Sequence, residues 1–313
     1  MKYATIAGLE RPAARVILGS MALLPQDQDL ACAMLDAFLA GGGNLIDTAP
    51  VYRGGGSERA IGEWLRRRGR RDDVMILTKG AHHASDGTKR VHPEEIAFDL
   101  GQSLERLGTP YVDLYLLHRD DPAVPVGEIV ETLHHHQRKG RIRAIGGSNW
   151  THERLHAANE YANAKGLAPF SASSPNLSLA VPNEPMWADC VSVSGDAPAL
   201  EWYRQQEFPL LSWSSQGGGF FSGRFRPEIT HDANMARVYY SDANWERLRR
   251  AEQLAAELGA SPIQVALAWV LSQPELRTFA LIGPRTLEEL ESSLAGAEME
   301  LTPQQVAWLN LQD

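Results

Sequence analysis

"NLIDTAPVYRGGGSERAIGEWL", residues 44–65, begins as a short apolar run and ends with apolar residues at helical spacing. The apolar run is typical of a strand buried on both faces, as a parallel sheet requires. Asp47 and Tyr52 lie where the strand gives way to a loop rich in Pro and Gly. A strand end followed by a loop allows both side chains to converge on one point, whereas a helix would direct them to different faces. We expect the glycines after Tyr52 to form a loose connection beside a substrate opening.

Similar apolar runs recur along the whole chain and alternate with longer amphipathic stretches. Eight runs are found, at residues 15–20, 44–49, 74–80, 112–118, 142–149, 170–174, 209–215 and 279–283. The clearest helical patterns cover residues 27–43, 92–108, 126–140, 151–166 and 261–274. Several of them have Pro or acidic residues at the start and Gly at the end. This alternation, without a break in composition, predicts an α/β fold: one (β/α)8 TIM barrel formed by residues 1–313 as a single domain.

A doubly wound open sheet is the competing fold. It would require a Gly-x-Gly-x-x-Gly turn directly after an early strand, and "GGGSER" (54–59) has the wrong spacing and follows a long loop. In the barrel, residues 1–12 are expected to form a short hairpin that closes its bottom. Residues 179–198 and 217–240 read as long irregular loops at the C-terminal face, where barrels of this kind build their sites.

Composition excludes several classes of function. The net charge of −9 argues against a nucleic-acid partner, and the basic run at 66–71 is interpreted as a solvated helix end, as is "HHH" at 134–136. The two cysteines, Cys32 and Cys190, give neither a disulfide framework nor the spacing of a metal site. No signal peptide or run of 18 apolar residues is present, so we expect a cytoplasmic protein without a membrane partner.

Polar groups end three consecutive strands of the predicted barrel. Asp47 ends the second strand with Tyr52 just beyond it, Lys79 ends the third, and His118 ends the fourth. Neighbouring strands lie about 5 Å apart, so these four groups can meet at one rim. Lys79 would then favour the phenolate of Tyr52 and lower its pKa, with Asp47 holding the lysine charged. His118 could donate a hydrogen bond to a carbonyl oxygen, which makes a plausible proton-transfer set.

Five segments of the chain resemble the aldo-keto reductase family in sequence, order and spacing. They are "NLIDTAPVY" (44–52), "ILTKG" (76–80), "VDLYLLHRDDP" (112–122), "GRIRAIGGSNW" (140–150) and "SPIQVALAWVLSQP…IGPRTLEEL" (261–290). The resemblance implies a (β/α)8 barrel that reduces carbonyl compounds with NADPH. The family's catalytic tetrad falls on Asp47, Tyr52, Lys79 and His118, with Tyr52 as the general acid that protonates the carbonyl oxygen.

The resemblance also implies residues that bind the cofactor. Ser148 and Asn149 match the pair that holds the nicotinamide amide, and Trp213 matches the aromatic residue on which the ring stacks, although it could also be a core residue. The loop that meets the pyrophosphate corresponds to Ser214, Gln216 and Gly218. His82 and His83 could line a substrate pocket. Trp187 is either a pocket wall or a packing anchor.

The adenosine end of the implied cofactor site departs from the family pattern. Gly283 and Arg285 match the site for the adenosine phosphate, and an arginine there suits a 2′-phosphate, which favours NADPH over NADH. The family usually has Gln where this chain has Ser174. It has Gln and Asn where this chain has Glu289 and Ser293, and a glutamate near a 2′-phosphate would be repulsive unless Arg285 intervenes.

Three functions remain in competition at this stage. The leading one is NADPH-dependent reduction of a small aldehyde or ketone, or the reverse oxidation. The alternatives are a sugar or cyclitol dehydrogenase that works mainly in the oxidative direction and, from another class, a non-catalytic nucleotide-sensing subunit. No metal is expected, and the sequence leaves the oligomeric state open.

Overall fold

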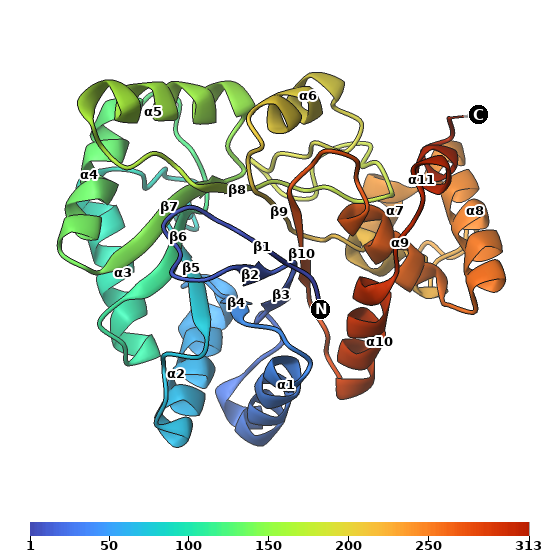
Figure 1. Cartoon of the computed structure of the whole chain (residues 1–313), viewed down its shortest axis with the longest axis horizontal. Coiled ribbons are helices and arrows are strands. Elements are labelled where there is room, and N and C mark those ends of the chain that lie inside the picture. The colour runs from blue at the N-terminus through green and yellow to red at the C-terminus, as the bar shows by residue number, and fades with distance from the viewer. Residues whose placement is uncertain (313) are drawn as a thin grey trace.

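The computed structural model describes residues 1–312 and contains a closed barrel of eight parallel strands (Figure 1). The strands follow one another around the barrel in chain order, and the last pairs with the first. They are β3 (Val16–Gly19), β4 (Leu45–Asp47), β5 (Met75–Gly80), β6 (Val112–Leu117), β7 (Ile142–Ser148), β8 (Ala172–Ser174), β9 (Leu210–Ser212) and β10 (Thr278–Ile282). The predicted barrel is confirmed; Asp313, the last residue of the predicted domain, lies outside the described residues.

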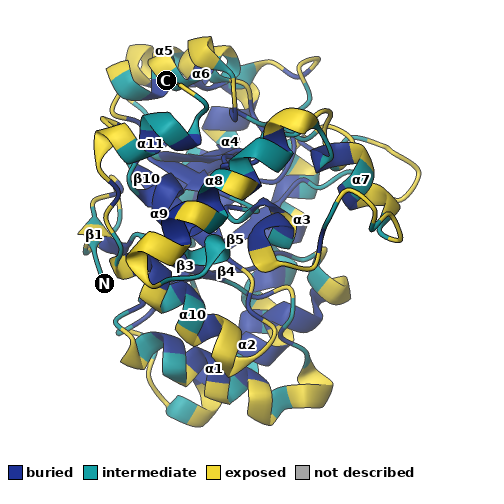
Figure 2. Ribbon diagram, turned by 90° about the vertical axis from the view of Figure 1, so that its right-hand side faces the viewer, coloured by how far each residue is buried: buried dark blue, intermediate teal, exposed yellow. Residues whose placement is uncertain are grey.

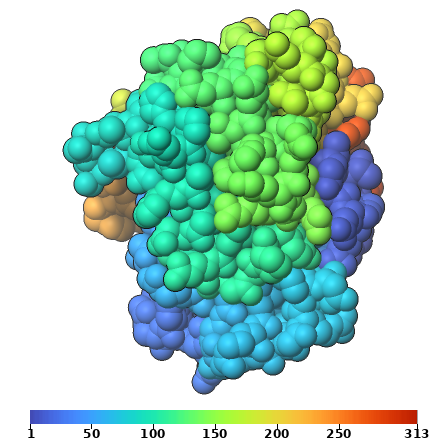
Figure 3. All heavy atoms as spheres, turned by 90° about the vertical axis from the view of Figure 1, so that its left-hand side faces the viewer, coloured from blue at the N-terminus to red at the C-terminus, as the bar shows by residue number. Residues whose placement is uncertain are grey.

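Helices surround the barrel, with their buried faces against the strands and their exposed faces outward (Figure 2). All five predicted helices are present to within a few residues. The helices are α1 (Gln28–Ala40), α2 (Gly56–Arg68), α3 (Pro93–Leu107), α4 (Val126–Arg138), α5 (His152–Lys165), α6 (Ala197–Gln205), α7 (Ala233–Tyr239), α8 (Asp242–Leu258), α9 (Pro262–Leu271), α10 (Leu287–Glu298) and α11 (Pro303–Leu309). Seen from one side, α3, α4 and α5 form a continuous outer layer, coloured teal to green in Figure 3.

The alternation of side chains along each strand produces two hydrophobic layers. In β6, Leu114 and Leu116 belong to the cluster inside the barrel, whereas Tyr115 and Leu117 belong to the larger cluster between strands and helices. Successive side chains of a strand point to opposite faces, so one strand serves both layers. This double burial explains why the strands read as continuous apolar runs in the sequence.

The N-terminal segment closes the bottom of the barrel, as predicted. Strands β1 (Tyr3–Ala4) and β2 (Ala13–Ala14) pair antiparallel, and Ile6 packs into the cluster inside the barrel. Gly8 has a φ of +86°, and a Cβ there would lie 3.2 Å from the carbonyl oxygen of Arg143. The hairpin therefore requires glycine at this position, for its backbone conformation and for its approach to the start of β7.

The two long loops at the C-terminal face differ from each other. Residues 179–196 are irregular, as expected, with α6 beginning at Ala197. Residues 217–240 are not: they contain the 3₁₀ segment η3 (Gly217–Ser222) and helix α7, whose first turn is capped by Asp232. A helix of two turns shows little hydrophobic periodicity and depends on its cap, so the sequence pattern did not predict α7.

Two of three local predictions about solvation were wrong. The glycines after Tyr52 are not slack: Gly55 is buried, and a Cβ on it would lie 2.7 Å from Nε of Arg106. The basic run, by contrast, is a solvated helix end as predicted, with Arg66, Arg67 and Arg70 exposed at and just after the last turn of α2, and only Arg71 donates to an internal acid, Asp113, at 2.6 Å. His136 is buried on the inner face of α4. Among residues 1–312, no single helix is long and apolar enough to cross a membrane.

Candidate active site

The four predicted proton-transfer residues come together at the C-terminal end of the barrel. Asp47 is the last residue of β4, Lys79 lies at the end of β5, and His118 directly follows β6. Tyr52 begins the 3₁₀ segment η2 (Tyr52–Gly55) just after β4. Because β4 pairs with β5 and β5 with β6, the three strand ends are neighbours. The predicted convergence of these side chains is therefore observed in the structure.

Lys79 is the centre of the cluster. Its ammonium forms a buried ion pair with Asp47 and donates to the Tyr52 hydroxyl at 3.0 Å and to the Thr48 carbonyl at 3.1 Å. The Tyr52 hydroxyl also approaches Asp47 Oδ2 at 3.4 Å. The rings of Tyr52 and His118 are 5.9 Å apart between centroids and nearly perpendicular. The Tyr52 hydroxyl thus lies between a cation and an anion, and its ring packs edge to face with an imidazole.

The balance of charge at Tyr52 differs from the expectation. Burial raises the pKa of Tyr52, Asp47 raises it further, and Lys79 only partly offsets the two. The pKa of Lys79 is itself raised, since Asp47 and Tyr52 outweigh the effect of burial. Burial also raises the pKa of Asp47, against the opposing effect of Lys79. Tyr52 is therefore a neutral phenol at neutral pH, and the predicted lowering of its pKa is wrong.

His118 is held in its neutral form. Burial is the main cause of its strongly lowered pKa, with smaller contributions from Lys79 and Arg119. Its ring lies 4.9 Å from that of His82, nearly perpendicular, so the expected position of His82 beside the site is observed. His83 packs against His82, with the ring centroids 4.2 Å apart. A neutral imidazole can donate one hydrogen bond, as orientation of a carbonyl oxygen requires.

The candidate nicotinamide residues lie at the ends of the next strands and are bonded to the tetrad. Ser148 Oγ donates to the carbonyl of Ser174 at 3.0 Å, which joins the ends of β7 and β8. Asn149 Nδ2 donates to Ser148 Oγ at 3.2 Å and to the carbonyl of His118 at 3.3 Å. The indole of Trp213, just after β9, donates to Asn149 Oδ1 at 3.1 Å. These four residues form one network beside His118.

A nicotinamide amide can bind to this network only where polar groups have hydrogen bonds left to make. Asn149 Oδ1 also accepts from the backbone N–H of Val191 at 3.1 Å, so both its amide atoms are engaged. Ser174 Oγ is buried and has no partner, which makes it a free polar group at the end of β8. The residues therefore fit an amide, provided that Asn149 exchanges a present partner, such as Trp213, for the cofactor.

The loop after β9 approaches the end of β10. Ser215 Oγ donates to the carbonyl of Leu281 at 2.7 Å, and Gln216 Nε2 donates to the carbonyl of Ile263 at 3.3 Å. Ser214 and Gly218 both have positive φ, of +48° and +63°. At Gly283 a Cβ would meet nothing within 4 Å, so the backbone after β10 is accessible. The predicted pyrophosphate and adenosine residues therefore lie on two adjacent connections.

The start of α10 carries a carboxylate where the cofactor phosphate is expected. Thr286 caps the helix by accepting from the N–H of Glu289 at 3.2 Å. Glu289 Oε2 in turn accepts from the N–H of Arg285 at 2.7 Å. Ser293 Oγ bonds to the carbonyl of Glu289, so it is directed along the helix. Helix N-termini attract anions, and here Glu289 already occupies part of that position.

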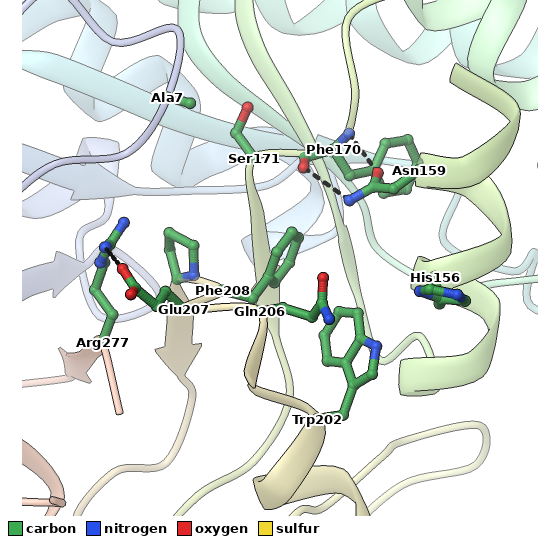
Figure 4. A pocket seen from close by; sticks show the side chains of 11 residues that line it. Ala7, His156, Asn159, Phe170, Ser171, Trp202, Gln206, Glu207, Phe208 and Arg277 are labelled. Atoms are coloured by element: carbon green, nitrogen blue, oxygen red, sulfur yellow. Dashed lines mark hydrogen bonds and ion pairs between the residues drawn. The ribbon is translucent and has the colours of Figure 1, made fainter. Parts of the chain in front are cut away.

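The structure contains no metal cluster, among the residues it describes, and one of its hollows lies away from the tetrad. Residues 1–312 contain no group of His, Cys, Asp or Glu suited to a metal ion. A hollow of about 260 Å³ lies at the opposite end of the barrel, before β8 and β9, lined in part by Ser171, Trp202 and Arg277 (Figure 4). Its position at the N-terminal face separates it from the tetrad.

The sequence does not predict where two residues near the site, Trp187 and Arg119, lie. Trp187, in the loop after β8, is 52% exposed and its ring lies 5.7 Å from that of Trp213, so it faces the candidate site. Arg119 directly follows His118 and is buried. The motif "LLHRDDP" contains Arg119, but nothing in it indicates that this arginine, unlike most, lies inside the protein.

The model of the aldo/keto reductase family matches residues 15–310. The chain therefore belongs to the aldo/keto reductase family and is an oxidoreductase of small carbonyl compounds or alcohols, in a family that uses NAD(P)H. The resemblance noted in the sequence is confirmed.

Curated relatives include a reductase and a bacterial aldo-keto reductase. Norsolorinic acid reductase stcV of Emericella nidulans is 28% identical over 89% of this chain and 70% of its own length. Aldo-keto reductase YhdN of Bacillus subtilis is 28% identical over 93% of this chain and 87% of its own. A solved structure, glycerol dehydrogenase from Gluconobacter oxydans, superposes with a TM-score of 0.79 at 24% identity, covering 99% and 96% of the two chains. The last comparison supports the fold.

Proposed function

We propose that this protein reduces small aldehydes or ketones with NADPH and that Tyr52 donates the proton. The observation that carries the proposal is the contact of the Tyr52 hydroxyl with Lys79 and Asp47, beside a neutral His118, at the C-terminal end of the barrel. A phenol in this position has a proton to give and a charged neighbour to stabilise the phenolate left behind. We further propose one catalytic domain over residues 1–313, acting in the cytoplasm.

The cofactor, when bound, supplies the hydride. Ser148, Asn149 and Ser174 would hold the nicotinamide amide at the ends of β7 and β8, with Trp213 against the ring. The residues Ser214, Gln216, Gly218, Gly283, Arg285, Glu289 and Ser293 would hold the phosphates and the adenosine. The buried free hydroxyl of Ser174 and the accessible backbone at Gly283 support this assignment.

Each member of the tetrad has a separate task in this proposal. His118 donates a hydrogen bond to the carbonyl oxygen and orients it. Tyr52 transfers its proton to that oxygen as the negative charge develops. Lys79, already bonded to the phenol oxygen, stabilises the resulting phenolate, and Asp47 keeps Lys79 charged in a buried position.

The charge balance at Tyr52 supports reduction as the direction of catalysis at neutral pH. A raised pKa keeps the phenol protonated at neutral pH, which suits a general acid in reduction. Oxidation of an alcohol needs the phenolate as a base, so a sugar or cyclitol dehydrogenase would work mainly at alkaline pH. The relative norsolorinic acid reductase is named for reduction, and reduction is the direction that we propose.

The preference for NADPH rests on Arg285. Its guanidinium is exposed beside the start of α10 and can pair with a 2′-phosphate. Glu289 opposes this preference because its carboxylate lies at the same turn and would repel a phosphate or accept a ribose hydroxyl. We therefore propose NADPH as the favoured cofactor and NADH as a usable one.

A screen of cofactor consumption tests the proposal. The protein is mixed with NADPH or NADH and with aldehydes, ketosugars and α-keto compounds, and absorbance at the nicotinamide band is followed. Consumption of NADPH with at least one carbonyl class is the expected result. Binding of NADPH, seen by tryptophan fluorescence, without turnover of any class would favour the nucleotide-sensing alternative and contradict the proposal.

A further inference from the structure

Arg119 is the only arginine among residues 1–312 that is more than nine-tenths buried, with 5% of its surface exposed. Its guanidinium makes one hydrogen bond, from Nη1 to the carbonyl of His118 at 2.8 Å, while Nε is buried without a partner. Within the described chain no carboxylate forms an ion pair with it. The neighbouring Arg154, by contrast, is paired with Asp120 at 2.8 Å. Arg119 is thus a buried cation lacking a counter-ion.

None of the groups around Arg119 forms an ion pair with its guanidinium within residues 1–312. The charge of Arg119 acts on His82, His118 and Cys190, so its guanidinium lies among residues at the C-terminal end of the barrel. Burial lowers the pKa of both histidines and raises that of the Cys190 thiol, so all three are neutral. Asp189 is the one nearby acid; Lys89, at 2.6 Å, is the main cause of its lowered pKa, Arg119 contributes less, and its carboxylate is half exposed.

A buried charge without a partner is costly, because it has lost its hydration and no opposite charge compensates for the loss. An arginine kept in such a state next to a site indicates that its counter-ion arrives from outside. The planar guanidinium matches carboxylates and phosphates, to which it can form two parallel hydrogen bonds.

We propose that Arg119 binds an anionic group of the substrate, so that the preferred substrates are aldehydes or ketones that carry a carboxylate or a phosphate. The inference rests on the proposed function, because it assigns a substrate class to the same site. His118 orients the carbonyl oxygen, and Arg119, the next residue on the same strand end, receives the anion. A neutral substrate leaves the guanidinium unpaired and is accepted poorly, because a site built for a polar partner rejects an analogue that lacks it.

Matched substrate pairs test the inference. 4-Carboxybenzaldehyde is compared with methyl 4-formylbenzoate, and glyceraldehyde 3-phosphate with glyceraldehyde, using NADPH and the wild-type protein. We expect kcat/KM to be at least tenfold higher for one anionic member than for its neutral partner, and the pair that differs tells whether the anion is a carboxylate or a phosphate. A ratio of kcat/KM near one between the anionic and the neutral member of both pairs overturns the inference.

Variants assign the preference to one side chain. Arg119→Gln is expected to remove the preference, mainly by lowering kcat/KM for the anionic aldehyde, and Arg119→Lys is expected to retain part of it. Arg226→Gln, which removes a cation that is already paired with Glu252 at 3.1 Å, is the matched control and should keep the preference. An undiminished preference in Arg119→Gln would overturn the inference.

A binding measurement separates this inference from the proposed function. If no aldehyde of any kind is reduced, the proposed function fails, and calorimetric titration with terephthalate and with inorganic phosphate then decides the role of Arg119. Binding that is at least tenfold weaker in Arg119→Gln supports an anion site. Equal binding to both proteins, or none to either, overturns it.

Discussion

Replacing Asp47 with Asn tests the buried charge pair on which the site depends. The substitution keeps the size of the side chain and removes the anion that is paired with the Lys79 ammonium. For charges about 3 Å apart in an effective dielectric of about 20, Coulomb's law gives about 5 kcal/mol of lost attraction. Lys79 can limit this loss by giving up its proton, which costs about 4–5 kcal/mol at pH 7 for a pKa of about 10.4. We therefore expect Asp47→Asn to lower the free energy of unfolding by about 3–5 kcal/mol at pH 7.

The sign of the pH dependence is a second, independent part of this prediction. In the variant, Lys79 is buried without its counter-ion, so its pKa in the folded state falls below its pKa in the unfolded state. At a pH between these two values, the unfolded state binds more protons than the folded state. Stability then rises with pH in that window. At pH 9 the cost of deprotonating Lys79 is only about 2 kcal/mol, and the deficit of the variant should shrink to that value.

Urea denaturation at pH 7 and pH 9, followed by tryptophan fluorescence, measures both numbers. Asp73→Asn is the control, because Asp73 pairs with Arg68 near the surface and its loss should cost less than about 1 kcal/mol at either pH. A deficit for Asp47→Asn below about 1 kcal/mol at pH 7, or one that does not shrink at pH 9, would refute the reasoning.

Two further predictions concern cofactor choice and acid stability. Glu289→Gln should tighten NADPH binding about tenfold relative to NADH, because it removes a negative charge near the 2′-phosphate; isothermal titration measures both affinities, with Glu288→Gln as the control. Burial lowers the pKa of His136 to about 4, so the unfolded state binds an extra proton between about pH 6.5 and 4 and wild-type stability falls as the pH drops. His136→Gln should lose less stability over that window in urea titrations.

Outcomes that contradict these two predictions are equally specific. An unchanged ratio of NADPH to NADH affinity in Glu289→Gln would mean that the carboxylate does not face the 2′ position. Parallel loss of stability on acidification in the wild type and His136→Gln would assign the acid sensitivity to other groups.

The architecture could be predicted from the sequence because a parallel barrel imposes a simple pattern. Each strand is buried on both faces, so runs such as "VDLYLL" are apolar throughout, and each helix between them has one apolar face. Helix α7 could not be predicted, since it is short and depends on the Asp232 cap and on packing around Met235. Local patterns are weakest where a segment is stabilised mainly by its neighbours.

The meeting of the tetrad could be predicted because strand ends of a barrel share one rim, which turns sequence order into proximity. The direction in which the pKa of Tyr52 shifts could not be predicted from the sequence. It depends on whether burial and Asp47 outweigh Lys79, and those contributions are set by distances and solvent access. The burial of Arg119 could not be predicted either, because the residues next to it in the sequence do not distinguish it from an exposed arginine.

The central claim is that Tyr52 supplies the proton while the nicotinamide supplies the hydride, and Tyr52→Phe tests it most directly. The wild type and the variant are given NADPH deuterated at the transferred position and an aldehyde that the screen shows to be reduced. The account predicts deuterium on the carbonyl carbon of the wild-type product, and a rate 10²- to 10⁴-fold lower in Tyr52→Phe, on the order expected for a general acid, with NADPH affinity unchanged. A variant that reduces the aldehyde within tenfold of the wild-type rate would contradict it.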